Sequence, residues 1–383
     1  MKAAPVGGAP RRARTQPVRC RETVLEDYAQ IHALERRYRL GFRSYEEWAH
    51  LWLNNPVRKR VPGLPIGWVL EDDKRQIVGS IGSVPFGFEL GGRQLIAGTS
   101  SAWVVDDQYR AYAPLLLDRF LTQPGVDIHL GVSPNGEAQA AVAQHSERIP
   151  MGQWDRAAFW ITNHWRFSGS ALAKRRIPFR SALRVPVWMA MVIHQTVRPD
   201  ALRAALRKTA RYDVAMCTAF DERFDEFWQA LSAHNHDRLL AIRSRDVLEW
   251  HFRYPLARGT AWVSTVTADD RLLAYAVFCR KDVGGIDLRR VRLVDYQSRD
   301  GDMTPLLSIL ADVIERCRQD GTAVLESIGW RLDPGDVMDR LAPYRRTMPS
   351  WQYFYTVTDP ALAVTLRERT VWNPSQYDGD ACI

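Results

Sequence analysis

The second half of this 383-residue chain repeats the order of sequence patterns found in its first half. The stretch "GWVLEDDKRQIVGSIGSV" has a counterpart in "AWVSTVTADDRLLAYAVF", which places Trp68 opposite Trp262, and Asp106 lies opposite Asp295. The residue numbers differ by 194 for the tryptophans and by 189 for the aspartates, a drift that loop insertions of a few residues explain. A repeat on this scale predicts two similar structural units in one chain.

Each half combines helices with strands that pair mostly with their sequence neighbours. In the first half, apolar residues at steps of three and four from Leu25 predict a helix, and a second helix is predicted over 45–53. Two strands then meet at Gly91-Gly92, a dipeptide typical of a tight antiparallel turn. A strand to Val105, a helix, a further strand and a further helix complete the set. The sequence therefore predicts an α+β fold of two tandem domains, each a mixed, mostly antiparallel sheet flanked by helices.

Composition and pattern set the expected domain boundaries. Residues 1–21 are rich in Ala, Pro, Gly and Arg, so they should form a disordered basic tail. We expect a first domain over 22–165, a linker with a helix over 166–211 and a second domain over 212–357. A C-terminal extension over 358–383 should lie on the second domain.

The chain carries a net charge of +8 and has a pI near 9.3, yet its basic clusters are short and widely spread. This spread favours a solvated surface, with an anionic small ligand as the alternative, and we do not expect a nucleic acid partner. Five scattered cysteines are typical of reduced cytosolic thiols. The start of the chain lacks the apolar segment of a secretory signal, and the longest apolar run, 185–193, is too short to span a bilayer. We therefore expect a cytoplasmic protein without a membrane partner; nothing in the sequence specifies its oligomeric state.

The stretch "SSAWVVDDQYRAYAPLLLDRFL", residues 100–121, places Arg110 between a strand and the start of a helix. Free backbone N–H groups and the helix dipole make such a corner an anion-binding arrangement. Glycines usually let a phosphate approach the backbone here, but none occurs in this stretch. The corner thus has the topology of a phosphate site with bulkier side chains than usual.

The order of these elements resembles the GNAT superfamily of acyl-CoA-dependent N-acyltransferases. "AWVVDDQYRAYAPLLLDRF" is similar to the family's strand followed by V-x-P-x-Y-R-G-x-G-x-G-x-x-L-L, and "GVSPNGEAQAAVAQHS" is similar to the strand end and Asn-capped helix that come next. The resemblance covers roughly 22–165 and 212–357. It looks like the tandem GNAT proteins of bacterial surface-polysaccharide and natural-product pathways.

The resemblance implies an acyl-CoA co-substrate, acetyl-CoA or another acyl-CoA, and no metal. Pantetheine would lie along the strand, and the pyrophosphate would bind the turn at 111–115. The first half is the better candidate, because Asp300 and Asp302 of the second half would repel a pyrophosphate. The residues implied in cofactor binding are Trp103, Val104, Val105, Arg110, Ala111, Ala113, Pro114 and Asn135.

Transfer to an amine needs a base for the ammonium and often an acid for the leaving thiolate. Asp106 lies at the mouth of the expected strand gap and His129 on the next strand, so both are candidate bases. The family's acid is often a Tyr after the capping Asn; Val142 stands at that position, and His145 follows one turn later as a substitute. Each candidate has a structural alternative: an Asp as a turn former, a His as a core residue.

Three functions remain open on the sequence. The first is an acyl-CoA-dependent N-acyltransferase acting on a small-molecule amine such as an amino sugar. The second is a Fem-type aminoacyl transferase, also a tandem GNAT fold, which takes its acyl group from charged tRNA; the absence of a long helical arm and of a concentrated basic face speaks against it. The third is a catalytically degenerate GNAT-fold binding protein.

Overall fold

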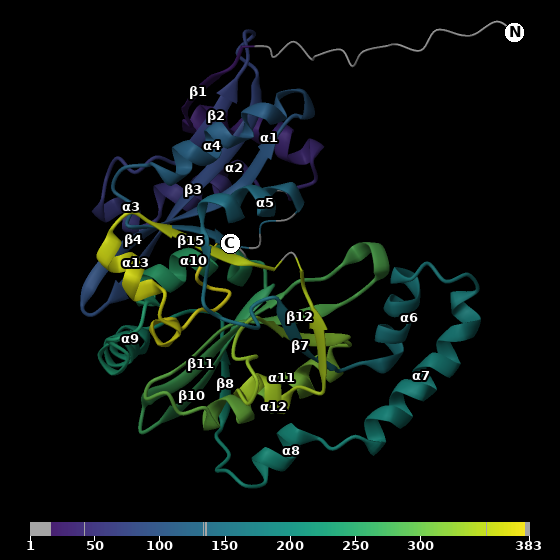
Figure 1. Cartoon of the computed structure of the whole chain (residues 1–383). Coiled ribbons are helices and arrows are strands. Elements are labelled where there is room, and N and C mark those ends of the chain that lie inside the picture. Colours follow the sequence, from purple (N-terminus) through teal and green to yellow (C-terminus); the bar gives the residue numbers. More distant parts are fainter. Residues whose placement is uncertain (1–16, 42, 133, 135, 350, 380–383) are drawn as a thin grey trace, which may run out of the picture.

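The structure is a computed structural model, which describes residues 17–379 except 42, 133, 135 and 350. The chain folds into two β-sheets, each covered by helices, and the sheets lie side by side (Figure 1). This confirms the expected α+β architecture of two mixed, mostly antiparallel sheets.

The first sheet is built largely from the first half of the chain. Its strands are β1 (Arg19–Glu22), β2 (Gly67–Glu71), β3 (Ile77–Leu90), β4 (Arg93–Val105), β5 (Ile128–Val132), β6 (Glu147–Arg148), β9 (Leu240–Ala241) and β15 (Tyr353–Val357). Their order is β1-β2-β3-β4-β5-β15-β6, and β9 pairs with β3. Only β4 and β5 are parallel. Gly91 and Gly92 join β3 to β4 with φ of 61° and 73°, values that favour glycine.

The second sheet repeats the parallel step. Its strands are β7 (Arg156–Ile161), β8 (Val214–Cys217), β10 (Ala261–Ala268), β11 (Arg271–Arg280), β12 (Arg290–Ser298), β13 (Val324–Ile328) and β14 (Tyr344–Thr347). They follow the order β14-β7-β13-β12-β11-β10-β8, in which only β12 and β13 run parallel. The pair β12–β13 is therefore the counterpart of β4–β5.

The two sheets exchange a strand. β7 comes from the first half but pairs with β13 and β14, whereas β15 comes from the second half and pairs with β5 and β6. Strand signals in a sequence are local and do not say which neighbour a strand will take, so the repeat gave no sign of this exchange. The division into domains at 22–165 and 212–357 stays a prediction. β7 and β15 connect the two predicted domains, because each pairs with strands of the other sheet.

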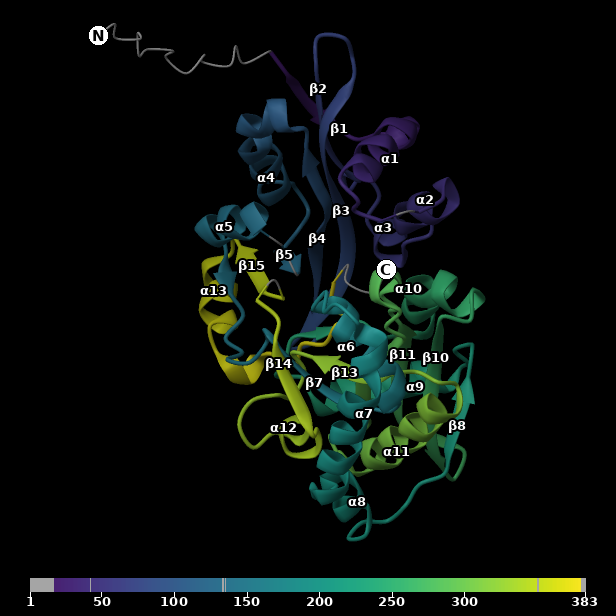
Figure 2. The same ribbon diagram turned by 90° about the vertical axis from the view of Figure 1, so that its right-hand side faces the viewer.

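Helices cover both faces of the first sheet. On one face lie α1 (Tyr28–Arg37), α2 (Tyr45–Leu53) and α3 (Pro56–Arg60); on the other lie α4 (Ala113–Leu121) and α5 (Gly136–His145) (Figure 2). A short helix, η1 (Leu25–Asp27), precedes α1, and η2 (Asp107–Tyr112) precedes α4. Ser44 begins α2 as a side-chain cap, its Oγ accepting from Glu47 N at 3.3 Å.

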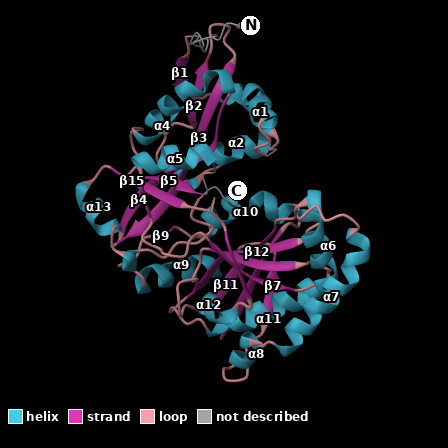
Figure 3. Ribbon diagram, turned by 45° about the vertical axis from the view of Figure 1, so that its right-hand side comes forward, coloured by secondary structure: helices cyan, strands magenta, loops and turns pink. Residues whose placement is uncertain are grey.

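The second sheet is enclosed in the same way (Figure 3). Its helices are α9 (Arg223–His234), α10 (Arg245–Ala257), α11 (Thr304–Gln319) and α12 (Val337–Leu341), with η3 (Gly284–Ile286) before β12. Along β11, Tyr275 and Val277 face the core shared with α9 and α10, whereas Ala276 and Phe278 face α11. This alternation is the two-residue period of a strand buried on both faces.

One hydrophobic core passes from one half into the other, joining Trp48 and Phe86 to Phe224 and Trp250. At its centre α2 and α10 meet. His50 Nε2 donates to the Trp250 carbonyl oxygen at 2.9 Å, and Trp250 Nε1 donates to the His50 carbonyl oxygen at 3.1 Å. The two helices therefore exchange equivalent hydrogen bonds across the junction.

The connection between the halves consists of three helices, α6 (His164–Lys174), α7 (Arg180–Val197) and α8 (Ala201–Leu206), which curve along the edge of the second sheet (Figure 1). The helix predicted in this linker is present as α8, and α7 contains the apolar run. After β15 the chain forms α13 (Pro360–Leu366) and η4 (Arg369–Val371).

Both ends of the described chain differ from the expectation. Residues 19–21, assigned to the basic tail, form β1, because Arg21 pairs with Asp27 at 2.7 Å and with Glu71 at 2.8 Å. The C-terminal segment up to Asp378 is not a surface extension. Tyr377 is fully buried, and its hydroxyl donates to the Ile242 carbonyl oxygen at 2.7 Å.

Candidate functional site

The strands β4 and β5 separate part-way along their length. They pair only at Ala97–Thr99 with Ile128–Leu130, although β4 continues to Val105. From Ser100 onward, β4 has no strand partner on that side among the described residues, while it still pairs with β3 on the other. The resemblance to the GNAT superfamily implied a gap beside Trp103–Val105, and β4 is separated from β5 there.

A bulge lies in this unpaired part of β4. Ala102 has a φ of 49°, a conformation uncommon for a residue other than glycine, and the β3–β4 register shifts at this point. Before the bulge Ala97 faces α2; after it Val104 faces α2, and Val105 packs under α4. The bulge therefore changes which side chains reach each face where the strands separate.

The corner after β4 is helical rather than an open turn. η2 continues directly into α4, with Tyr109 N–H bonded to the Asp106 carbonyl at 2.8 Å and Ala113 N–H bonded to the Arg110 carbonyl. The predicted pyrophosphate turn at 111–115 therefore has few free N–H groups, because the start of the combined helix has moved back to Asp107. The stretch lacks glycine and β-branched residues, which fits a helix.

The charged side chains of the corner form ion pairs, one with α1 and one within η2. Asp106 binds Arg37 Nη1 through both carboxylate oxygens at 2.6 and 2.7 Å, which ties the end of β4 to α1. Arg110 Nη2 donates to Asp107 at 2.5 Å. The candidate base Asp106 and the candidate phosphate ligand Arg110 thus both have an oppositely charged neighbour.

The other predicted cofactor residues lie around this corner. Val104 and Val105 are buried, and Trp103 is half-buried with an indole N–H that makes no hydrogen bond to the described residues. Ala111 and Pro114 are exposed, and Ala113 is half-buried. Asn135 lies outside the described residues.

The two candidate histidines lie in different environments, one buried and one exposed. His129 faces α4, where its ring meets Phe120 edge-on at 5.4 Å, and only 3% of it is exposed. Burial lowers its pKa to about 4, which speaks against His129 as a base for the acceptor amine. His145 is exposed at the last turn of α5, and Val142, at the expected tyrosine position, belongs to the core beside Val105.

A carboxylate that the sequence reasoning missed lies on the opposite face of β4. Glu35 of α1 is 8% exposed, and burial raises its pKa although Arg43 opposes this shift. Glu35 lines a cavity of about 20 Å³ with Ser101 and Ala102 of the bulge and with Ser80 of β3. The Ser80 hydroxyl is buried and makes no hydrogen bond to the described residues. A cavity of this size holds about one water molecule.

Glu35 had no sequence signal of its own. It follows Leu34 in an amphipathic helix, where a lone Glu is normally solvated. Only the packing of α1 against β3 and β4 shows that its carboxylate is buried beside the point where the strands separate. A buried carboxylate with a raised pKa is the usual form of a general base or acid.

In the second half, the corresponding strands also separate, and a buried ion-pair cluster lies at that part of β12. β12 and β13 pair only from Arg290 to Leu293, and beyond this point Asp295 of β12 binds Arg243. Its guanidinium donates to Asp295 at 2.8 and 3.1 Å and to Asp378 of the C-terminal segment at 3.1 Å. All three side chains are buried. Asp295, the counterpart of Asp106, is therefore a structural residue.

The corner after β12 carries its own carboxylate. Asp302 accepts from both the N–H and the hydroxyl of Thr304 at 2.9 and 2.7 Å, so a carboxylate already binds the start of α11. The helices α8 and α12 border a cavity of about 320 Å³ at this corner, which Ala201, Met303 and Leu341 line. A bound anion would have to displace this carboxylate.

Structures of similar fold identify this arrangement. A GCN5-related N-acetyltransferase from Kribbella flavida covers 92% of this chain over 74% of its own length, with 12% identity and a TM-score of 0.54. A GCN5-related N-acetyltransferase from Anabaena variabilis covers 90% over 73% of its length, with 12% identity and a TM-score of 0.52. Saccharomyces cerevisiae N-myristoyltransferase with bound myristoyl-CoA covers 92% over 84%, with 10% identity and a TM-score of 0.52. The chain has the tandem GNAT fold.

These likenesses concern the fold, because no protein-family profile and no curated protein matches the sequence. In both halves the first strand of the parallel pair continues beyond its partner, and among the described residues only in the second half does a buried Arg–Asp pair occupy the position that follows. In the part of the chain that the structure describes, no helix is long and apolar enough to cross a membrane, and no three His, Cys, Asp or Glu side chains gather as a metal site.

Proposed function

We propose that the first half of this protein is an acyl-CoA-dependent N-acyltransferase. The observation that carries the proposal is the separation of β4 from β5 after Thr99, within a tandem GNAT fold whose second half holds the buried Arg243–Asp295 pair at the corresponding strand. Free N–H and C=O groups along Ser100–Val105 can bind the amide groups of a pantetheine arm as a further strand would. The unpartnered indole N–H of Trp103 offers one more donor.

The acceptor amine would approach from the α1 and α2 side. There Glu35, acting through a water molecule in the adjacent cavity, would take the proton of the ammonium, because its raised pKa suits a base. The amine nitrogen would form a bond to the acyl carbon, the carbon–sulfur bond would break, and the thiolate would take up a proton. N–H groups at the β4 bulge would polarise the acyl carbonyl oxygen.

The corner binds a diphosphate less well than the strand binds pantetheine. η2 has taken up the N–H groups expected at 111–115, and Asp107 places a carboxylate beside Arg110. We infer that most of the binding free energy comes from pantetheine and the acyl group. Acetyl-CoA is the simplest donor, and an amino sugar or other small amine is the acceptor class.

Calorimetric titration of the purified protein with acetyl-CoA tests the proposal. We expect binding that Arg110→Glu weakens, since a second carboxylate would then face the diphosphate. Absence of heat with acetyl-CoA and with longer acyl-CoAs at millimolar concentration would contradict it.

One observation favours a second candidate, aminoacyl transfer from charged tRNA. The linker holds a helix pair and eleven Lys and Arg residues between 164 and 211, against one acidic residue, Asp200. These are the arm and the basic concentration that the sequence analysis did not find. Retention of tRNA that falls steeply with salt, combined with no response to acyl-CoA, would support this candidate over the first.

A further inference from the structure

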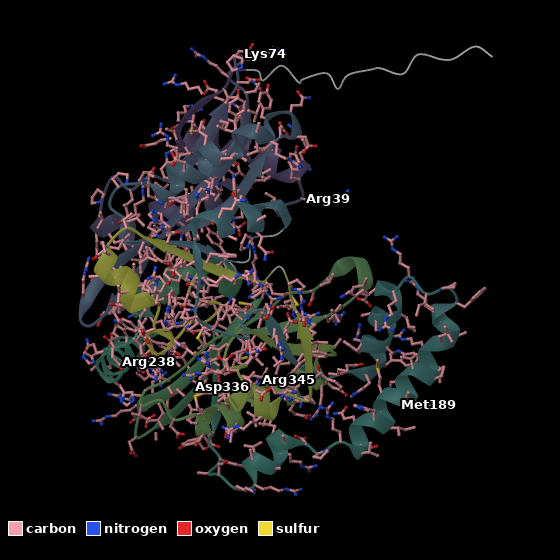
Figure 4. All side chains as sticks on the ribbon, viewed as in Figure 1. Arg39, Lys74, Met189, Arg238, Asp336 and Arg345 are labelled. Carbon is pink, nitrogen blue, oxygen red and sulfur yellow. The ribbon has the colours of Figure 1, made fainter. Side chains whose placement is uncertain are left out.

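α7 is an 18-residue helix with none of its residues buried. It packs mainly against α6, and His194 near its C-terminal end stacks on Tyr344 of β14; its other side lies at the periphery of the molecule, where Figure 4 labels Met189. It also contains Pro186, which removes one helical hydrogen bond. Helices of this length gain most of their stability from packing. One side of α7 therefore has no packing partner among the described residues.

The exposed side of α7 is apolar. Among the described residues, most exposed large hydrophobic side chains lie between 165 and 197, and those on α7 are Leu183, Val185, Met189, Ile193 and Val197. The last four follow one another at steps of four, which turns each by about 40° and keeps the set within about 120° of the helix. The stretch 185–193 contains no polar residue.

The surroundings of this stripe are strongly basic. The segment 164–211 has a net charge of +10, whereas the whole chain has +8, so the remainder is slightly acidic. The exposed cations of this segment are Lys174, Arg175, Arg176, Arg180, Arg198, Arg203, Arg207, Lys208 and Arg211. Within the described residues none of these nine forms an ion pair with an acidic side chain.

A groove of about 840 Å³ begins at the C-terminal end of α7 and shares Gln195, Thr196 and Arg198 with it. Its floor is apolar, with Trp160 and Ile314, and six arginines line it: Arg198, Arg203, Arg211, Arg318, Arg340 and Arg345. Guanidinium groups bind phosphate oxygens in pairs, so this groove suits phosphate groups next to apolar chains.

We propose that α7 and its basic flanks are a docking surface for an anionic lipid bilayer. An apolar helical stripe bordered by Lys and Arg is the arrangement of a helix that lies in the bilayer interface. The nine-residue apolar run is far shorter than the roughly 20 residues that a spanning helix needs, so α7 lies on the membrane and does not cross it. This departs from the expectation of no membrane partner, which considered spanning segments only.

A second copy of this chain or a nucleic acid would account for only one of the two features of this surface, its charge or its apolar stripe. A second copy of this chain would bring two segments of charge +10 together, and like charges repel. A nucleic acid would account for the cations but would leave the apolar stripe in water. An anionic bilayer satisfies both the charge and the apolar side chains.

Co-sedimentation of the full chain with vesicles tests the proposal. We expect binding to phosphatidylcholine vesicles that contain one third phosphatidylglycerol, and none to pure phosphatidylcholine. The double variants Met189→Glu with Ile193→Glu, and Arg175→Glu with Arg176→Glu, should each weaken binding about tenfold or more. Val364→Glu is the matched control: Val364 of α13 is 65% exposed, close to the 63% of Ile193, and should bind as the unmodified chain does.

Far-UV circular dichroism and the melting temperature show that each variant is folded, and the arginine pair lies outside any helix. Equal binding to neutral vesicles, no binding to anionic ones, or unchanged binding by both double variants would overturn the proposal. So would a dimer in solution that Met189→Glu with Ile193→Glu makes monomeric, or tRNA retention without vesicle binding.

Discussion

Two buried titratable side chains on opposite faces of the first sheet have opposite pKa shifts. Burial raises the pKa of Glu35, beside the β4 bulge, and lowers the pKa of His129, under α4. The carboxylate therefore accepts a proton more readily than an exposed Glu does, whereas the imidazole is held neutral. Sequence reasoning chose the histidine and missed the glutamate, because the face on which each side chain lies is set by tertiary packing.

Replacement of Glu35 by Gln removes the proposed base but keeps the shape of the side chain. We expect kcat for amine acylation to fall about 100-fold while KM for acyl-CoA changes little. The rate of the unmodified enzyme should rise with pH through the raised pKa of Glu35, and the variant should lose this rise. Glu46→Gln, at an exposed position of α2, is the control. A pH profile shared by both enzymes would remove Glu35 from the mechanism.

His129 should make folding sensitive to acid. Its folded-state pKa of about 4 lies below the ordinary 6.5, so its contribution to stability is complete above pH 6.5 and is lost as pH falls through 4. The difference corresponds to about 3 kcal/mol. His129→Phe cannot titrate, and urea unfolding between pH 4 and 7 should show a shallower pH dependence than the unmodified chain. An unchanged slope would contradict the assignment.

At the scale of elements, the corner after β4 decides how well a diphosphate can bind. The sequence predicted its place between a strand and a helix, since hydrophobic periodicity marks both. It did not predict that η2 would extend α4 back to Asp107, because propensities over six residues are weak compared with tertiary packing. The result is a helix start that carries a carboxylate of its own, Asp107, paired with Arg110.

Asp107→Asn should improve this corner. The substitution removes a negative charge beside Arg110 while keeping a side chain that can cap the helix. We expect acetyl-CoA to bind about threefold more tightly, as loss of one exposed charge–charge repulsion allows. Calorimetry measures this change, and the gain should fade at high salt. Weaker binding by the variant would mean that Asp107 itself positions the ligand.

At the scale of the whole molecule, the two halves share one architecture and differ in the side chains at the point where the parallel strands separate. The internal repeat and the order of elements were sufficient to predict two α+β units of the tandem GNAT fold. The exchange of β7 and β15, and the buried cluster of Arg243, Asp295 and Asp378, arise from contacts between segments far apart in sequence. No local pattern encodes such contacts, so they required the structure.

Arg243 connects three such segments, and its loss should affect the entire molecule. Arg243→Met leaves Asp295 buried without its cation, and we expect the free energy of unfolding to fall by about 3 to 5 kcal/mol. Arg223→Met breaks an exposed ion pair with Asp221 and should cost about 0.5 kcal/mol or less. Denaturant unfolding of the two variants measures both effects. Similar decreases in the free energy of unfolding for the two variants would show that the buried cluster contributes no more to stability than an exposed ion pair.

The position of β15 makes the first sheet depend on the second half of the chain. β15 is hydrogen-bonded along the outer edge of β5, the strand from which β4 separates. Removal of the second half would therefore expose this edge of β5 to solvent. The exchange of strands thus makes the two halves interdependent, so that neither sheet can be completed by one half of the sequence.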